Sequence, residues 1–450
     1  MTCQHKTLSF TSSSHSSKAG FIRPTPQQRK AAATLQTLEK GKGKLKRPAP
    51  EDDSELGPFY APLILPGDDL AEDPEYPPQS IQEWRTDEDR NEVTPQRKTI
   101  YVAAPTSDPF LQSWSVPNSR HADASVAPPD IVDITDYLRA FYHGMPVKRL
   151  PSPLRLTHWG AKPSATPRYV GMCTATEAVR IRTRASRDGV FPRQLNLDDL
   201  LDATISVLPD DAFALLIMVP FDIYEGPDDD FCAGRAYGGS RVAVVSSARY
   251  HPGLDAHQNV DRLHAWPASH CKQYMNICCA EADTPDTRPP KKKPKGRVEP
   301  STSDSLEPAA YAALSPLHAA VLAHAALPSL TSSSPPAALS ALWLGRACRT
   351  ASHELGHCLG IDHCVYYACA MQGSASLAED ARQPPFLCPV DRAKLLCASG
   401  ADREGAERTM LAFCDRHPDC HLFAALASWI RAQVPADSDS SAKKARTGDN

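Results

Sequence analysis

Long apolar stretches are missing from this sequence of 450 residues. No segment reaches the roughly 18 continuous apolar residues that a membrane-spanning helix needs. Residues 1–20 are rich in Ser, His and Lys and lack the apolar core of a secretory signal peptide. We therefore expect an intracellular, cytoplasmic protein without a signal peptide or a transmembrane segment.

An excess of charge of either sign is also missing. The 49 Lys and Arg residues nearly balance the 53 Asp and Glu residues, and the formal net charge is -4. Such a balance gives no general attraction to nucleic acids or membrane surfaces, so we expect neither as a partner. Internal repeats of the length found in solenoid proteins are absent as well. The sequence gives no indication of the oligomeric state.

Proline, in contrast, is abundant. The 42 prolines are about twice the usual share of about 5%, which indicates long loops and linkers. Three segments of low apolar content are predicted to be disordered: an N-terminal arm over residues 1–55, a basic insertion at about 284–307 and a tail over 435–450. Residues 56–434 are predicted to form one domain around the insertion. The lysine run 291–295 is either a nuclear-localisation patch or part of a solvated linker.

Hydrophobic periodicity predicts helices that alternate with short apolar strands. Residues 133–143 have apolar side chains at helical spacing, while residues 215–219 and 241–246 are compact apolar runs typical of buried strands. Further helices are expected over 194–205, 311–327, 340–360 and 403–434, the last interrupted near Pro418, and a further strand over 99–103. This alternation predicts a layered α/β or α+β fold.

The strongest chemical signal is the segment 353–357, which reads His-Glu-Leu-Gly-His. Histidines four residues apart lie on one face of a helix, so His353 and His357 can bind the same metal ion. Glu354 lies beside them, where a carboxylate can take a proton from metal-bound water without binding the metal itself. This arrangement predicts a zinc-dependent hydrolase.

A third ligand follows at a short distance. Gly360 comes three residues after His357, where a helix can end on a residue with positive φ and let the chain turn back. His363 can then complete a site of three histidines, with one coordination position left for water. Glu379 is the alternative third ligand, as in zinc sites built from two histidines and a glutamate. The positions of Gly360 and His363 favour the histidine.

Cysteine is frequent, with 14 residues. In the reducing compartment expected here, clustered cysteines are more often metal ligands or small buried residues than partners in disulfides. Cys364, Cys369 and Cys388 follow the third histidine, and Met371 lies among them. A methionine at this place can form an apolar floor beneath the metal. Together these residues form a second group of potentially functional side chains next to the three histidines.

The runs 353–364, 369–374 and 387–389 together resemble the archaemetzincins, a family of metzincin zinc peptidases. The segment 236–246 is similar to the strand beside the active-site helix in that family. The resemblance implies a metzincin or zincin-like mixed twisted sheet with an active-site helix and a C-terminal subdomain after the third zinc histidine. It also implies a catalytic zinc on three histidines, a structural zinc on four cysteines, and aminopeptidase action on short peptides.

One position departs from the family's pattern, since Asp391 stands where the fourth cysteine is expected. Cys364, Cys369 and Cys388 match the family's ligands. A carboxylate oxygen can bind zinc at about 2.0–2.2 Å, so Asp391 can complete the second site. Cys397, about one and a half turns further along a helix, is the competing ligand. A second site that holds no zinc is the third alternative.

Two neighbouring tyrosines, Tyr366 and Tyr367, fall between the third histidine and Met371. A tyrosine hydroxyl near zinc can stabilise the oxyanion of peptide hydrolysis, but packing is the interpretation that we favour for both residues. His264 and His270 lie close together in the sequence but at a spacing that fits no metal-site template. Packing is the simpler explanation for these histidines too.

The predicted activity is that of a zinc-dependent metallopeptidase acting on peptide substrates. His353, His357 and His363 would hold the ion, Glu354 would activate the zinc-bound water, and Zn²⁺ would polarise the peptide carbonyl. The alternative is a zinc-stabilised peptide-binding or scaffold protein without turnover, which the Pro-rich arm and insertion would suit. A purely structural site, however, needs neither Glu354 nor an open coordination position.

Overall fold

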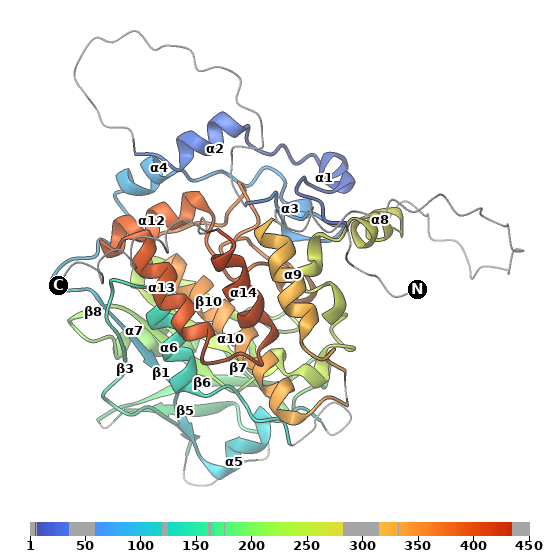
Figure 1. The fold of residues 1–450 in the computed structure, drawn as a ribbon. Coiled ribbons are helices and arrows are strands. Elements are labelled where there is room, and N and C mark those ends of the chain that lie inside the picture. The colour runs from blue at the N-terminus through green and yellow to red at the C-terminus, as the bar shows by residue number, and fades with distance from the viewer. Residues whose placement is uncertain are drawn as a thin grey trace, which may run out of the picture.

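The computed structural model describes residues 5, 7–35, 59–118, 125–160, 164, 166–174, 176–281, 315–331 and 333–433. Figure 1 shows strands on the lower left of the molecule and the helices of the C-terminal half, in orange and red, in front of them. None of the helices in this part of the chain combines the length and the hydropathy needed to cross a membrane. The architecture is mixed α/β, as the alternation of helices and strands predicts.

The first sheet has five strands in the order β10 (Gly234–Tyr237), β11 (Val242–Ser246), β8 (Ala212–Val219), β1 (Thr99–Ala103) and β3 (Val147–Arg149). All neighbouring pairs are parallel except β10 and β11, which are antiparallel. Every residue of β1, β8 and β11 is buried. Strands covered on both faces have continuous apolar sequences, which is why these strands could be recognised from the sequence.

The two faces of this sheet belong to two different cores. Ile100 and Leu216 lie in the core shared with α6 (Ile131–Phe141) and α10 (Pro336–Cys358). Tyr101 and Leu215, their neighbours along the strands, lie in the core shared with α7 (Leu197–Ser206). Successive residues of a strand point to opposite faces, so one sheet holds helices on both sides. The face with α10 is the one on which the predicted metal ligands His353 and His357 lie.

A second sheet completes the core on the α7 side. Its six strands have the order β2 (Thr106–Ser107), β4 (Arg155–His158), β5 (Tyr169–Cys173), β6 (Ala178–Ala185), β7 (Arg193–Asn196) and β9 (Ile223–Tyr224). Leu156, Val170 and Ile181 from its middle strands are fully buried in that core. This sheet therefore lies away from the predicted metal ligands.

The remaining helices are α1 (Ser14–Ala19), α2 (Pro26–Ala32), α3 (Asp69–Glu72), α4 (Ile81–Thr86), α5 (Pro109–Gln112), α8 (Lys272–Glu281), α9 (Pro316–Ala326), α11 (Leu377–Asp380), α12 (Pro389–Ser399), α13 (Arg403–Cys414) and α14 (His421–Arg431). Short 3-10 turns are η2 (Ser113–Ser115), η3 (Gly238–Ser240), η4 (Ala248–Tyr250), η5 (Pro252–Leu254), η6 (Arg262–His264) and η7 (Ala268–His270). The helix expected over 340–360 is confirmed as α10, and the interruption near Pro418 separates α13 from α14.

Part of the predicted N-terminal arm is ordered. The interpretation of residues 1–55 as disordered is wrong for residues 7–35, which contain α1 and α2. Leu8 and Ala32 are buried in the main core, and the backbone N–H of Ser9 donates to the carbonyl of His270 at 2.8 Å. These few apolar residues are buried against residues that are far away in the sequence. Such tertiary contacts cannot be predicted from the local amino-acid composition. Residues 36–55, 284–307 and 435–450 lie outside the described residues, and the extent of the domain stays a prediction.

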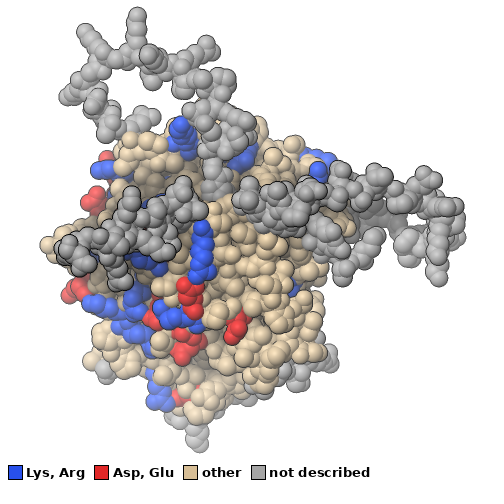
Figure 2. Space-filling model, in the orientation of Figure 1, with Lys and Arg blue, Asp and Glu red and all other residues tan. Residues whose placement is uncertain are grey.

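Charge is distributed unevenly over one face of the molecule. Figure 2 shows charged side chains gathered over the region of α13, whereas the surface over α9 is mostly uncharged. The difference is already present in the two sequences, because α9 has no Lys, Arg, Asp or Glu and α13 begins Arg-Glu-Gly-Ala-Glu-Arg. The charged side chains of α13 include i,i+4 ion pairs, which support an exposed helix.

Candidate metal centres and active-site cleft

The first ligand cluster is built on the last turns of α10. A backbone carbonyl fixes each of its two imidazoles: Nδ1–H of His353 donates to the oxygen of Ala370 at 2.7 Å, and Nδ1–H of His357 donates to the oxygen of Ile361 at 2.8 Å. Since a carbonyl oxygen can only accept, both rings carry their proton on Nδ1. The Nε2 atom of each ring is therefore left with a free lone pair.

These two Nε2 atoms lie 3.1 Å apart. Because neither carries a proton, they repel each other, and a shared cation removes the repulsion. With Zn–N bonds of about 2.0–2.1 Å in a tetrahedral site, two ligand nitrogens lie about 3.3 Å apart. One nitrogen of His363 joins them, and the three ligand atoms lie within 4.8 Å of one another. The cluster therefore fits a zinc ion with one open position.

The turn that follows α10 brings His363 back to the other two histidines. Gly360 has a φ of 74°, which a side chain with Cβ rarely adopts. Its N–H donates to the carbonyl of His357 at 2.9 Å, and the N–H of Ile361 donates to that of Gly356 at 3.1 Å. Together these bonds close the end of the helix. α10 ends at Cys358, and the positive φ that was expected at Gly360, two residues later, is confirmed.

Burial controls the charge of the cluster. It lowers the pKa of His353 to about 4, with the neighbouring His363 as the next cause, and it lowers the pKa of His357 well below its ordinary value. The pKa of His363 is lowered by burial as well. The three imidazoles are therefore neutral near pH 7, as metal ligands must be.

Glu354 lines the same cleft as the histidines and is buried. Burial raises the pKa of this carboxyl to about 8, while the nearby charge of Arg235 acts in the opposite direction. A divalent cation held by the three histidines would lower this pKa and keep the carboxylate ionised. Strand β10 covers Glu354 closely: a Cβ on Gly234 would lie 3.2 Å from its Cγ.

Met371 lies against the back of the metal-binding helix. A Cβ on Gly356 would lie 2.4 Å from the Sδ atom of Met371, so the thioether is in direct contact with the α10 backbone between the two histidines. The carbonyl of Met371 also accepts a hydrogen bond from the N–H of Cys364 at 2.8 Å. Met371 thus connects the first ligand cluster to the cysteines.

The three histidines open into a cleft with a volume of about 1100 Å³. Its lining residues include Tyr76, Arg235 and Asp362, none of which the sequence indicated as a site residue. The ring of Tyr76 lies 5.5 Å from that of His363, measured between centroids. No periodicity or spacing connects Tyr76 to a histidine nearly 300 residues later, although Asp362 could have been noticed as the neighbour of a ligand.

Neither Tyr366 nor Tyr367 is among the residues that line this cleft. Tyr367 packs instead beneath the guanidinium groups of Arg23 and Arg29 and beside Phe59. These contacts agree with the packing interpretation of Tyr367. The tyrosines that line the cleft are Tyr76 and Tyr250.

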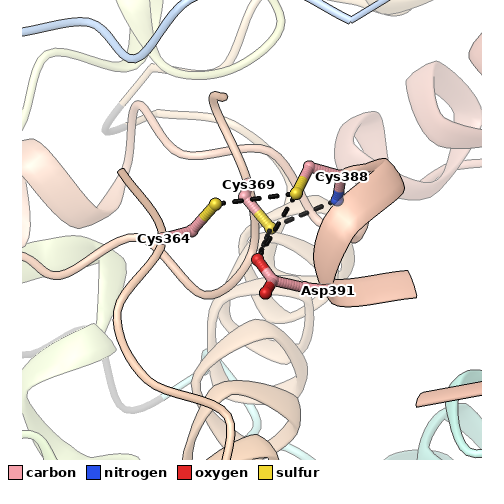
Figure 3. Close-up of side chains that lie close together, drawn as sticks. All are labelled: Cys364, Cys369, Cys388 and Asp391. Carbon is pink, nitrogen blue, oxygen red and sulfur yellow. Dashed lines mark hydrogen bonds between the residues drawn. The ribbon is translucent and has the colours of Figure 1, made fainter. Parts of the chain in front are cut away.

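The second ligand cluster lies directly after the first in the chain. Figure 3 shows Cys364, Cys369, Cys388 and Asp391 with their side chains turned toward one another. The Sγ atoms of Cys364 and Cys388 are 3.6 Å apart, and Oδ2 of Asp391 lies 3.3 Å from Sγ of Cys369 and 3.4 Å from Sγ of Cys388. Zn–S bonds of about 2.3 Å in a tetrahedral site separate two sulfurs by about 3.8 Å. The donor set fits a zinc ion.

Helix α12 decides between the two candidates for the fourth ligand position. Cys388 is the residue before its first turn, and Asp391 lies within that turn, so both face the other cysteines. Cys397 lies near the opposite end of the helix and is exposed. The structure thus brings Asp391, and not Cys397, into the cluster.

Three other candidates are occupied elsewhere. Oε2 of Glu379 accepts hydrogen bonds from the backbone N–H groups of Ala375 and Asp69, and Glu379 is not part of the histidine cluster. The ring of His264 stacks on that of Tyr274, with centroids 4.1 Å apart. His270 donates from Nε2 to a backbone carbonyl at 3.0 Å. These contacts agree with packing roles for the two histidines.

Comparison with known proteins gives independent information. The family model described as Peptidase family M54 matches residues 336–395. The chain is 25% identical to archaemetzincin-2 of Macaca fascicularis over 366 residues, which are 81% of this chain and 76% of that protein. The identity and coverage are the same for archaemetzincin-2 of Homo sapiens. A crystal structure of an archaemetzincin from Methanopyrus kandleri covers 70% of this chain and 97% of its own, at 17% identity and a TM-score of 0.30.

Proposed function

Because this chain belongs to the archaemetzincins and is a zinc metallopeptidase, we propose that His353, His357 and His363 hold its catalytic zinc. Glu354 then acts as the general base. The observation that carries this proposal is the pair of proton-free Nε2 atoms 3.1 Å apart, with a buried carboxylate lining the same cleft. Peptides are the substrates.

Hydrolysis at this site would need the bound zinc, one side chain that transfers protons and two backbone carbonyls that orient the histidines. Zinc at this site supplies a Lewis acid that lowers the pKa of water and polarises the scissile carbonyl. Glu354 accepts the proton of the attacking water and later donates it to the departing amine. The carbonyls of Ala370 and Ile361 hold the imidazoles in the tautomer that can bind a metal.

Replacement of Glu354 tests the general base. Glu354→Gln keeps the shape of the side chain but cannot accept the proton, so kcat should fall on the order of 10²- to 10⁴-fold. Zinc content, measured by mass spectrometry, should not change. Glu404→Gln, an exposed position on α13, is the matched control and should hydrolyse peptides like the wild type.

Assays of this variant and of the wild type also distinguish a peptidase from a peptide-binding or scaffold protein. Unchanged hydrolysis by Glu354→Gln would rule out its role as the base. A wild-type protein that retains peptides from a library without cleaving them would instead support a binding or scaffold function.

The finer substrate class is the removal of N-terminal residues from short peptides. Asp362 supports this assignment, because its carboxylate is exposed in the cleft next to His363. A carboxylate there can accept a hydrogen bond from the α-ammonium group of a substrate. N-acetylated peptides lack this charge and would lose the contact.

The matching experiment compares short peptides with free and acetylated N-termini. Wild-type kcat/KM should be about 10- to 100-fold higher for the free peptides, as expected for a hydrogen bond to a charged group. Asp362→Asn should lose most of this preference, whereas Asp89→Asn, at an exposed position, should retain it. Equal rates for both kinds of peptide would indicate an endopeptidase and leave the catalytic zinc proposal intact.

The second cluster is proposed to hold a structural zinc on Cys364, Cys369, Cys388 and Asp391. Its distances and its complete burial support this assignment. We further assign α10 as the active-site helix, Met371 as the apolar floor of a metzincin-type site, and the residues after His363 as its C-terminal subdomain. The contact of Met371 with α10 supports the second of these assignments.

A further inference from the structure

A buried lysine lies beside the second cluster and has no part in the mechanism above. Lys394 is on α12, one turn after Asp391, and only 1% of its side chain is exposed. Its Nζ donates to Oδ1 of Asp391 at 2.9 Å. The other carboxylate oxygen, Oδ2, is the one directed at Cys369 and Cys388. Lys394 therefore orients the carboxylate so that one oxygen is free to bind a metal.

The same lysine also balances charge. Three thiolates and a carboxylate around Zn²⁺ leave a net negative charge in a buried site, and the ammonium group of Lys394 offsets part of it. A fourth cysteine has no second oxygen for Lys394 to hold. Asp391 and Lys394 thus function as a pair, and the departure from four cysteines is compensated by a neighbouring residue.

The ammonium group has a second partner, which comes from the segment between α3 and α4. Oε1 of Gln79 accepts from Nζ of Lys394 at 2.8 Å and from the backbone N–H of Asp362 at 3.2 Å. Its Nε2 donates to the carbonyl of Gly360 at 2.9 Å. All three bonds are directed, so the amide of Gln79 is fixed in one orientation.

Gly360 and Asp362 are in the turn that presents the histidines. Between them is Ile361, whose carbonyl holds Nδ1 of His357, and directly after them is His363. A continuous chain of hydrogen bonds therefore runs from the cysteine cluster through Lys394 and Gln79 to the turn of the catalytic site.

We propose that Lys394 and Gln79 are positioning residues that couple the two metal centres, Lys394 by orienting Asp391 and Gln79 by fixing the turn at residues 360–363. The inference rests on the two zinc sites of the proposed function. Groups that orient metal ligands typically contribute about 10- to 100-fold to metal affinity, which sets the size of the expected effects.

The test follows metal release from the full-length holoprotein in the presence of a chelator. Lys394→Met should weaken zinc binding by the cysteine cluster about 10- to 100-fold. Gln79→Leu should accelerate zinc loss from the histidine cluster by a similar factor. Gln82→Leu removes an exposed glutamine three residues away on α4 and is the matched control, with release like the wild type.

Cobalt substitution assigns each effect to one site. Thiolate-to-Co²⁺ charge transfer absorbs in the near ultraviolet and arises only at the cysteine cluster, because the histidine cluster has no sulfur ligand. Total metal content, measured by native mass spectrometry, reports both sites. The Lys394→Met variant should lose the charge-transfer band first, and Gln79→Leu should lose metal that contributes nothing to this band.

Making Lys394→Met in the Asp391→Cys variant as well controls for a general loss of folding caused by Lys394→Met. Asp391→Cys supplies a fourth thiolate and removes the carboxylate that Lys394 orients, so adding Lys394→Met should weaken metal binding there clearly less than it does in the wild type. An equal effect of Lys394→Met in both backgrounds, or identical release by Gln79→Leu and Gln82→Leu, would overturn the coupling alone. A wild-type protein with one zinc and no charge-transfer band would overturn the second site and this inference together, but not the catalytic site.

Discussion

Gly356 lies between the two histidines of α10 and faces Met371. A Cβ at this position would lie 2.4 Å from Sδ and 2.8 Å from Cε of Met371, so Gly356→Ala must displace that side chain. Overpacking typically costs about 1–3 kcal/mol, while alanine gains about 1 kcal/mol over glycine in a helix. We expect Gly356→Ala to lower the free energy of unfolding by up to about 2 kcal/mol, measured by urea denaturation.

A double variant provides the control for this contact. In the double variant Gly356→Ala with Met371→Ala, the shortened side chain at position 371 no longer has the Sδ and Cε atoms that would collide with the new Cβ at position 356. The double variant should therefore be less destabilised than the sum of the two single variants. Additive effects would mean that Met371 does not limit the size of residue 356.

His270 makes stability depend on pH. Burial lowers the pKa of this imidazole to about 4, against about 6.5 in an unfolded chain. Between these two pKa values the unfolded state binds more protons than the folded state, so the free energy of unfolding falls as the pH falls. The stability that comes from keeping His270 neutral is therefore complete above about pH 6.5 and is lost below it. From pH 6.5 to 5 the loss should be about 2 kcal/mol.

The measurement is urea unfolding at pH 7 and pH 5 for the wild type and His270→Gln. Glutamine can still donate to the carbonyl of Ala61 but does not titrate. Acid release of zinc affects both proteins alike, so the difference between them isolates His270. An equal loss of stability in both proteins would contradict the prediction.

At the scale of residues, chemistry that is local in sequence was predictable and chemistry that depends on tertiary contact was not. The spacing of His353, His357 and His363 predicts a metal site because a helix and one turn suffice to bring them together. Lys394 and Gln79 are separated by more than 300 residues, and nothing in either local sequence marks their hydrogen bond. The choice of Asp391 over Cys397 follows from where α12 begins.

Helices α1 and α2 are the elements whose order depends most on the rest of the protein. Leu8, which precedes them, is only 8% exposed and lies in the main core, whereas Ile22 between them is 86% exposed. We expect Leu8→Ala to lower the free energy of unfolding by about 2 kcal/mol or more, as for other buried leucines. Ile22→Ala is the matched control and should have little effect, since it removes a solvated side chain.

Thermal or urea unfolding of the two variants distinguishes a docked arm from a disordered one. Equal stability of Leu8→Ala and the wild type would support the disordered arm that composition predicts. The contrast with β8 explains the error for residues 7–35. An entirely buried strand has a continuous apolar sequence, while short polar helices need only a few buried residues to dock.

At the scale of the whole molecule, the cleft is assembled from distant parts of the chain. Tyr76 comes from the segment before α4, Arg235 from β10, and the histidines from α10 and its following turn. A layered fold could be predicted from alternating helices and strands, but which loops meet at the cleft depends on strand order. That order places β10 last in its sheet, beside α10, and this could not be read from local periodicity.

The place of β10 at the end of the first sheet has one more consequence. Within the described part of the chain, its only neighbour in that sheet is β11, so the other side of β10 presents main-chain N–H and C=O groups without strand partners. Gly234 and Arg235 of this strand border the cleft. An extended peptide at this edge can be held through its backbone, which every sequence shares. Discrimination between peptides would then fall to the side chains around the cleft.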